Sequence, residues 1–254
     1  MLLAIDIGNS NITVGGFDGD ILNFTARLAT DARLTADQYA VQLKSIMQLY
    51  NESEHNVEDC IISSVAPQVA ASVSAAVTKL CDVIPLQIGP GVKTGLNIRI
   101  DNPAQLGADL VAGAVGALNE YTLPCIIIDM GTATTLSVID SNGAFLGGSI
   151  GAGVNLTLKA LCENTAQLPD ISISAPDSVI GTNTVDSMRA GIVLGTAAML
   201  DGLIERIEDE LGEPATVVAT GGLSKSIILC CKRNIIYNEN LLLDGLKEIY
   251  EKNH

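Results

Sequence analysis

Two aspartates stand at the ends of short apolar runs, and each is followed two positions later by a glycine. Asp6 and Gly8 form the first pair, and Asp129 and Gly131 form the second. Glycine lets a ligand approach the backbone, and the free amides of such a turn, with the hydroxyl of Ser10, can donate to phosphate oxygens. A carboxylate repels phosphate unless a cation lies between them. The pattern therefore predicts a metal-bound nucleotide.

A single turn of this kind is equally well explained as an ordinary Asx turn, so the repetition is what favours a nucleotide site. Alternating residues follow each pair, at 11–17 before Asp18-Gly19-Asp20 and at 134–139 before Ser141-Asn142-Gly143. The second of these turns is a strong hairpin signal. The sequence thus predicts two similar halves that face each other across a cleft.

The composition agrees with an α/β fold of two similar lobes. Hydrophobic residues make up 48% of the 254 positions and aromatic residues only 3%, so small aliphatic side chains must fill the core. Such packing suits parallel sheets covered by helices. We predict an N-terminal lobe at 1–117 and a C-terminal lobe at 118–254.

The formal net charge of −15 and the pI near 4.3 argue against nucleic acid or an anionic membrane as partner, because both would be repelled. An anionic substrate must then be held by local amides, a few cations and metal ions. We find no run of about 18 consecutive apolar residues and no signal peptide, so we expect a cytoplasmic protein.

The six cysteines are expected to be reduced core thiols, because most lie in apolar runs and none forms a C-x-x-C pair. A disulfide between the adjacent Cys230 and Cys231 is the alternative. With only His55 and His254 in the chain, a structural zinc site is not expected.

Several helices and strands are predicted around these turns. A capping box of Thr35 and Gln38 predicts a helix start, Pro67 fits the first turn of a helix that runs to about Cys81, and 83–88 predicts a strand. Another helix is expected from about Leu106. Asp109 would lie in its first turn, where a carboxylate either serves the helix dipole or takes part in chemistry.

The second half predicts a glycine-rich turn at 147–153, a helix that ends near Asn164, and a long helix from Thr182 or Asn183 to Gly212. The turn lacks the lysine and serine of a Walker A loop. Small residues of the long helix form one stripe, explained by packing inside the protein or by a dimer contact: Gly191, Gly195, Ala198 and Gly202. A strand at 216–220 and a helix at 239–252 complete the prediction, with Gly221-Gly222 as a turn for adenosine.

Four motifs in this order resemble type III pantothenate kinases, within the actin-like ATPase and sugar kinase superfamily: GVKTGLNIRIDNPAQLGADL, IDMGTATT, LGGSIGAG and NTVDSMRAGI. The resemblance covers nearly the whole chain. It implies a homodimer that uses ATP to phosphorylate pantothenate to 4'-phosphopantothenate, the first step of coenzyme A biosynthesis.

The resemblance also assigns site residues. Mg²⁺ is implied near Asp6 through water, a monovalent cation (K⁺ or NH₄⁺) at Asp129, and a general base at Asp109. ATP phosphates are implied to bind Asp6, Ile7, Gly8, Asn9, Ser10, Asn11, Ile12, Thr13 and Thr132. Pantothenate is implied to contact Ile100, Gly107, Ala108, Asp109, Leu110 and Thr184, the last of these across a dimer interface.

Two positions depart from the family pattern. Leu110 stands where the family has arginine, and Ile100 where it usually has tyrosine. Leucine cannot replace the donors of an arginine that faces a carboxylate or amide. The departures leave three hypotheses: a pantothenate kinase with weakened substrate binding, a kinase of the same fold for another small alcohol, and a nucleotide-binding regulator without turnover.

Overall fold

The computed structural model describes residues 1–254, which form two compact units. The first unit contains Met1–Leu96, Asp101–Asn119 and Asn240–His254, and the second contains Asn97–Ile100 and Glu120–Glu239. The lobes expected at 1–117 and 118–254 were each continuous, whereas here the C-terminal segment belongs to the first unit and a short segment before the third helix belongs to the second.

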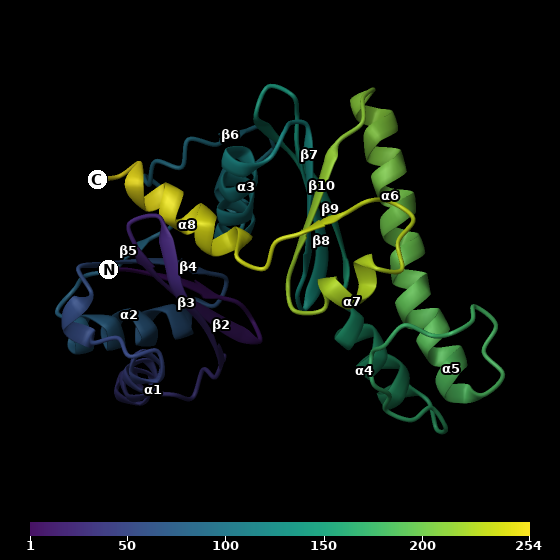
Figure 1. Cartoon of the computed structure of the whole chain (residues 1–254), viewed down its shortest axis with the longest axis horizontal. Helices are drawn as coiled ribbons and strands as arrows, with labels where there is room; N and C mark the ends of the chain where they lie inside the picture. Colours follow the sequence, from purple (N-terminus) through teal and green to yellow (C-terminus); the bar gives the residue numbers. More distant parts are fainter. The chain divides into compact units, whose positions relative to one another are not determined.

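The first unit is built on a five-stranded sheet with the strand order β3-β2-β1-β4-β5 (Figure 1). The strands β1, β2 and β3 form an antiparallel meander, and β1, β4 and β5 are parallel. Their bounds are Leu2–Ile7 (β1), Asn11–Asp18 (β2), Ile21–Ala29 (β3), Asp59–Ser64 (β4) and Leu86–Gln87 (β5). The strand predicted at 83–88 is thus only two residues long.

Helices cover both faces of this sheet. On one face, α1 (Ala36–Leu49) and α2 (Pro67–Cys81) pack against Ile5, Ile7 and Ile62. On the other, α3 (Ala108–Glu120) and α8 (Leu241–Glu251) pack against Ala4 and Ile61. The alternation of side chains along β1 and β4 therefore assigns each strand residue to one of two cores.

Local signals explain where these helices begin. The capping box of Thr35 and Gln38 is present at the start of α1, and Pro67 is in the first turn of α2. The third helix begins at Ala108, two residues later than predicted, after a 3₁₀ turn at Pro103–Gln105. The last helix ends at Glu251, one residue before the predicted end.

The second unit is built on a six-stranded sheet with the strand order β11-β10-β7-β8-β9-β6. Its strands are Asn97–Ile98 (β6), Cys125–Met130 (β7), Ala133–Ile139 (β8), Ala144–Ala152 (β9), Thr216–Thr220 (β10) and Ile236–Tyr237 (β11). The hairpin at Ser141-Asn142-Gly143 joins β8 to β9, as predicted. The glycine-rich turn expected at 147–153 is wrong, because most of these residues belong to β9. The reason is close strand packing: a Cβ on Gly148 would collide with the carbonyl of Leu136.

One face of the second sheet is covered by α4 (Val154–Asn164), α5 (Thr184–Arg189), α6 (Gly195–Leu211) and α7 (Ser224–Ile228) (Figure 1). A π-helical segment, Ala190–Leu194, joins α5 to α6 into one long helix. Asn183 caps its start, and Gly212, with φ +76°, ends it in the left-handed conformation. Both ends agree with the prediction.

The long helix is apolar on average, although it contains no unbroken run of 18 apolar residues. By length and composition, Thr184–Leu211 could cross a membrane, although only one such helix is present and core helices pass the same test. Gly191, Gly195 and Thr196 interrupt its apolar residues. Its residues Ile192, Val193 and Leu200 are buried in the core of the second unit, so one side of the helix packs inside the unit.

The small residues of this helix do not pack inside the unit. A Cβ on Gly191 or Gly195 would meet no atom within 4 Å, and Ala198 is exposed. Packing within the unit therefore does not account for Gly191, Gly195 and Ala198, whereas a Cβ on Gly202 would lie 3.3 Å from Nη1 of Arg206 in the same helix.

All six cysteines are free, including the adjacent Cys230 and Cys231. Burial raises the pKa of the Cys125 thiol and of the Cys231 thiol to about 12. Both thiols are thus protonated and unreactive at neutral pH, as expected for core cysteines.

Candidate active site

The turn after β1 is held in place by the end of β3. The amide of Gly8 donates to the carbonyl of Asn11 at 3.0 Å, which closes the turn. Thr30, directly after β3, donates its amide to the carbonyl of Ser10 at 3.0 Å and its hydroxyl to the carbonyl of Gly8 at 2.8 Å. Two carbonyls of the turn are therefore occupied by Thr30, and Asn9, Ser10 and Asn11 are exposed to solvent.

The predicted ATP-binding residues of this turn fall into two groups. Ile7 and Ile12 are fully buried in the core under α1 and α2, so they can offer a ligand only backbone atoms. Asn9, Ser10 and Asn11 are exposed, and Thr13 is half-buried. The side chains able to meet a phosphate are thus the polar ones of the set.

Asp6 lies between two hydroxyl-bearing residues of neighbouring strands. It pairs with Thr13 of β2 and with Ser63 of β4 in the sheet register. The hydroxyl of Ser63 is buried and has no hydrogen-bond partner. Since buried polar groups are nearly always paired, this hydroxyl marks a place for a ligand or a water molecule beside Asp6. The sequence analysis did not predict a role for Ser63.

Asp109 lies in the first turn of α3, in the same unit as Asp6. Its Oδ1 accepts a hydrogen bond from the amide of Leu110 at 2.8 Å, which fixes the orientation of the carboxylate. Burial raises the pKa of Asp109 above its usual value of 3.8, and the hydrogen bond from Leu110 opposes this shift. A carboxylate whose pKa is raised is a better proton acceptor than a solvated one.

Asp6 and Asp109 lie on the same side of the first sheet. The third helix packs through Val111 on Ala4 and Ile61, and alternation along the strands gives Asp6 the same face as Ala4. The metal-binding candidate in β1 and the candidate base in α3 are thus on the same side of the first sheet.

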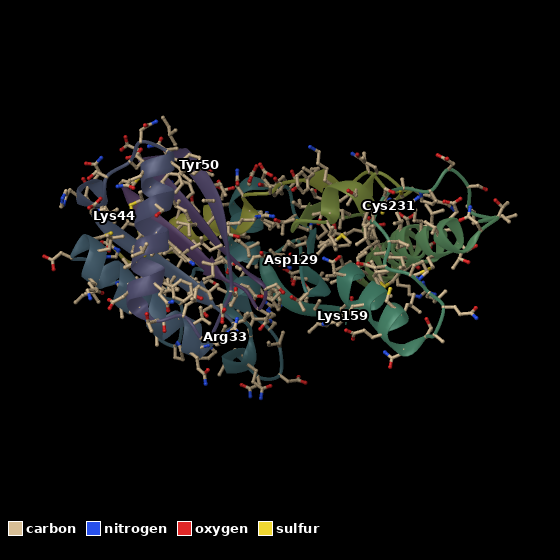
Figure 2. All side chains as sticks on the ribbon, turned by 90° about the horizontal axis from the view of Figure 1, so that it is seen from below. Arg33, Lys44, Tyr50, Asp129, Lys159 and Cys231 are labelled. Atoms are coloured by element: carbon tan, nitrogen blue, oxygen red, sulfur yellow. The ribbon has the colours of Figure 1, made fainter.

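In the second unit, Asp129 is at the C-terminal end of β7 and pairs with Thr135 of β8 and Thr220 of β10. It lies well apart from Cys231 and Lys159 of the same unit (Figure 2). A Cβ on Gly221, which has φ +94°, would lie 2.8 Å from Oδ1 of Asp129. The predicted adenosine turn is thus in contact with the second acidic strand end.

The turn after β7 rests on the start of α4. The amide of Gly153 donates to the carbonyl of Thr132 at 3.1 Å, and a Cβ on Gly153 would collide with the carbonyls of Gly131 and Thr132. Thr132 is exposed. Gly153 is therefore required for the shape of this turn, a role that the sequence analysis did not assign.

The remaining predicted substrate residues are divided between the units. Gly107, Ala108 and Leu110 surround Asp109 in the first unit. Ile100 lies in the second, where its Cγ2 would be 3.7 Å from a Cβ on Gly147. Thr184 begins α5 and lines a pocket of about 710 Å³ with Thr157, Asn183, Ser187 and Met188.

The acidic residues do not form a ready-made metal cage. No group of three or more histidine, cysteine, aspartate or glutamate side chains is arranged to hold a metal ion. Mg²⁺ commonly binds one or two carboxylates together with water and substrate phosphates, so Asp6 beside the Ser63 hydroxyl fits such an ion. Near Asp129, the buried hydroxyl of Thr135 lacks a partner and offers a further oxygen to a monovalent cation.

These features define a class of protein. In each unit a strand ends in an acidic glycine turn and continues into an antiparallel hairpin, β1 with β2 in the first unit and β7 with β8 in the second, as in the actin-like ATPase fold. The fold is similar to that of component A of (R)-2-hydroxyglutaryl-CoA dehydratase from Acidaminococcus fermentans, with a TM-score of 0.58 over 98% of this chain and 96% of that one at 15% identity. A putative 2-dehydro-3-deoxygalactonokinase from Sinorhizobium meliloti has the same TM-score, 0.58, over 99% and 96% at 14% identity.

Sequence comparison identifies the family within this class. The model of the type III pantothenate kinase family matches residues 2–206. The type III pantothenate kinase of Bifidobacterium animalis subsp. lactis is 42% identical over 253 residues, and that of Exiguobacterium sibiricum is 43% identical over 256, each covering 100% of both chains. The chain belongs to the type III pantothenate kinase family.

Proposed function

We propose that this chain transfers the γ-phosphoryl group of ATP to pantothenate and forms 4'-phosphopantothenate, the first step of coenzyme A biosynthesis. The observation that carries the proposal is the identity of about two residues in five with type III pantothenate kinases over the full length of both chains. The geometry supports it, because the predicted phosphate turn and the predicted base lie on one side of one sheet.

In the proposed reaction, the primary alcohol of pantothenate attacks the γ-phosphorus and the bond to the β,γ-bridging oxygen breaks to release ADP. The hydroxyl proton passes to Asp109. Phosphoryl transfer depends on positioning and charge neutralisation rather than on a covalent intermediate. A positioned general base typically contributes about 10²–10⁴-fold to the rate.

The residues of the first unit are assigned as follows. The turn of Asp6, Ile7, Gly8, Asn9, Ser10, Asn11, Ile12 and Thr13 binds the ATP phosphates, the two isoleucines through their backbone only. Asp6 would hold Mg²⁺ through water, and the ion would supply positive charge to the phosphates. Gly107, Ala108 and Leu110 contact pantothenate.

In the second unit, Thr132 binds phosphate, Ile100 and Thr184 contact pantothenate, and K⁺ or NH₄⁺ binds at Asp129. The contact of Gly221 with Asp129 supports a nucleotide here, because a ligand on the bare glycine turn would lie next to the cation.

The residues expected to bind the acceptor are the ones that depart from the family pattern. Leu110 and Ile100 are apolar where the family pattern has arginine and tyrosine, so a carboxylate or amide at these positions would lose its donors. An unpaired buried polar group costs about 1–3 kcal/mol. We therefore expect pantothenate to bind weakly. Two alternatives follow from the same observation: a kinase for a less polar alcohol, and a nucleotide-binding regulator without turnover.

We also propose a homodimer that forms through α6. Gly191, in the π-helical segment before α6, and Gly195 and Ala198 of α6 are exposed, and a Cβ on either glycine would meet no atom within 4 Å, so a second helix can come close to them. Helix interiors lose about 1 kcal/mol for each glycine relative to alanine, a cost that close helix packing would offset. Such a dimer agrees with the expectation that Thr184 serves the partner's substrate. With ATP as co-substrate, we place the enzyme in the cytoplasm.

The direct test is a coupled assay of ADP release in Mg²⁺ with K⁺ or NH₄⁺, with and without pantothenate. Pantothenate-dependent ADP release supports the proposal, and its absence at saturating pantothenate overturns it. The double variant Leu110→Arg, Ile100→Tyr should lower KM for pantothenate by about tenfold or more if the pocket is a weakened pantothenate site. The matched variant Leu110→Met, Ile100→Val should leave KM unchanged. If the first pair gives no gain, the acceptor is a different alcohol.

A further inference from the structure

A row of polar residues crosses four strands of the first sheet at one level. Arg27 of β3 pairs with Thr13 of β2, Thr13 pairs with Asp6 of β1, and Asp6 pairs with Ser63 of β4. Residues paired in register project their side chains to the same face of a sheet. The row therefore lies on the face that α3 covers, at the end where the Gly8 turn leaves β1.

Arg27 is the cation of this row and forms no ion pair. Most other lysines and arginines of the first unit are paired with carboxylates: Arg33, Lys44, Lys79, Lys247 and Lys252. Arg33 and Lys44 lie apart on this unit, each near its own carboxylate (Figure 2). Lys93 also lacks an ion pair, but it lies off the sheet on a loop whose backbone is tied to Asn253.

The opposite end of the row also has an unsatisfied group. The hydroxyl of Ser63 is buried and without a hydrogen-bond partner, while the guanidinium of Arg27 offers five donors. Arginine matches phosphate with two parallel hydrogen bonds, and a hydroxyl can serve a metal-bound water. A phosphate with its hydrated cation, lying along the row, would give hydrogen-bond partners to both Arg27 and Ser63.

The distances allow such a ligand. Neighbouring strands are about 4.8 Å apart, so Arg27 is roughly 10 Å from Asp6 at the backbone. A long arginine side chain can cross much of this gap above the short Thr13. Thr30, three residues after Arg27, donates hydrogen bonds to the carbonyls of Gly8 and Ser10. These bonds hold the end of β3 next to the phosphate turn.

We infer that Arg27 binds the terminal phosphate of ATP, the group that is transferred. The inference rests on the proposed function for the identity of the nucleotide. A metal ion held near Asp6 would neutralise the phosphates of ATP, and Asp109 lies on the same face of the sheet as Asp6. The γ-phosphate must lie between metal and base, and this is the face to which Arg27 belongs. In a chain of net charge −15, a local cation is also needed to hold the anion.

The test is the binding of ATP and of ADP, each with Mg²⁺ and without acceptor, measured by calorimetry. We expect the wild-type protein to bind ATP more tightly than ADP. Arg27→Ala should weaken ATP binding by about ten- to a hundredfold and change ADP binding little, because only ATP carries the γ-phosphate. Arg27→Lys keeps the charge but not the paired donors, so its affinity for ATP should lie between those of the wild type and Arg27→Ala.

Arg33→Ala is the matched control, since Arg33 is an exposed arginine of the same unit that is already paired with Asp31. It should bind both nucleotides as the wild type does. Because Arg27 is itself exposed, its variants should melt at the wild-type temperature. Unchanged ATP binding in Arg27→Ala, an equal loss of ATP and ADP, or a wild-type protein without preference for ATP would each overturn the inference.

The same variants separate this inference from the proposed function. If the wild type phosphorylates pantothenate and Arg27→Ala does so at the same rate, the inference is wrong and the proposed function stands. The opposite outcome has two parts: the wild type does not phosphorylate pantothenate, and the preference for ATP over ADP seen in the wild type is lost in Arg27→Ala. In that case the inference stands and the proposed function is wrong.

Discussion

Gly221 and Asp129 are in direct contact: a Cβ on the glycine would lie 2.8 Å from Oδ1 of the carboxylate and 2.7 Å from the carbonyl oxygen of Met130. The turn after β10 is thus packed against the end of β7. Two predicted parts of a nucleotide site, the adenosine turn and the cation-binding carboxylate, are joined within the second unit.

The first prediction is that Gly221→Ala destabilises the second unit and weakens ATP binding. The φ of +94° costs a side chain roughly 1–2 kcal/mol, and the collision with Asp129 and Met130 adds to it. Gly212→Ala is the matched control, because Gly212 has φ +76° but meets no atom within 4 Å. Melting temperature and calorimetric ATP binding are the measurements.

The control should lose stability only through its backbone conformation and should keep its ATP affinity. Equal losses of melting temperature in Gly221→Ala and Gly212→Ala, with ATP affinity intact in both, would show that the contact with Asp129 is unimportant.

The second prediction concerns Asp109 and pH. Since burial raises the pKa of Asp109 above 3.8, the carboxylate becomes protonated at a higher pH than a solvated aspartate does, and kcat/KM should fall as the pH falls through this raised pKa. Asp109→Asn should lower kcat by about 10²–10⁴-fold and remove this acidic limb from the pH profile. A variant that keeps both its rate and the acidic limb would rule out Asp109 as the base.

The raised pKa of Asp109 also makes the stability of the folded protein depend on pH. The folded protein binds the proton more tightly than the unfolded chain does, so stability falls as the pH rises from 3.8 through the raised pKa, and the full cost is present above it. Asp109→Asn should therefore melt at a higher temperature than the wild type at pH 7, and the difference should disappear below pH 3.8. A lower melting temperature of the variant at pH 7 would contradict this.

The third prediction is that Thr30 holds the phosphate turn. Thr30→Val removes the hydroxyl that donates to the carbonyl of Gly8 and leaves the volume nearly unchanged. The loss of one hydrogen bond, about 0.5–1.5 kcal/mol, should raise KM for ATP by about two- to tenfold. Steady-state kinetics measure the change, and Thr30→Ser, which keeps the hydroxyl, is the control. If serine and valine behave alike, the hydrogen bond does not order the turn.

Much of the fold could be predicted because its signals are local. The capping box of Thr35, the cap at Asn183 and the glycine at 212 each set a helix end through contacts within a few residues. The two acidic turns were predictable for the same reason, since an apolar run, a carboxylate and a glycine are neighbours in the chain.

Contacts between distant segments could not be predicted from the sequence. Residues 147–153 are rich in glycine and were expected to form a turn, but pairing with β8 makes 147–152 part of a strand in which Gly148 must lack a side chain. The roles of Thr30, Ser63 and Gly153 depend on segments that meet only in the folded unit. The row from Arg27 to Ser63 likewise depends on the register of four strands.

The last prediction concerns the proposed dimer. Ala198 lies in the middle of the exposed stripe of α6, and Ala198→Glu would place a charge where a second helix approaches, at a cost of burying an unpaired carboxylate. We expect this variant to be monomeric by light scattering and to bind pantothenate more weakly, because Thr184 would no longer reach the partner's substrate. Ala75→Glu, the same change on the exposed side of α2, should remain dimeric. A dimeric Ala198→Glu would place the interface elsewhere, and a monomeric variant with unchanged pantothenate binding would show that Thr184 does not act across it.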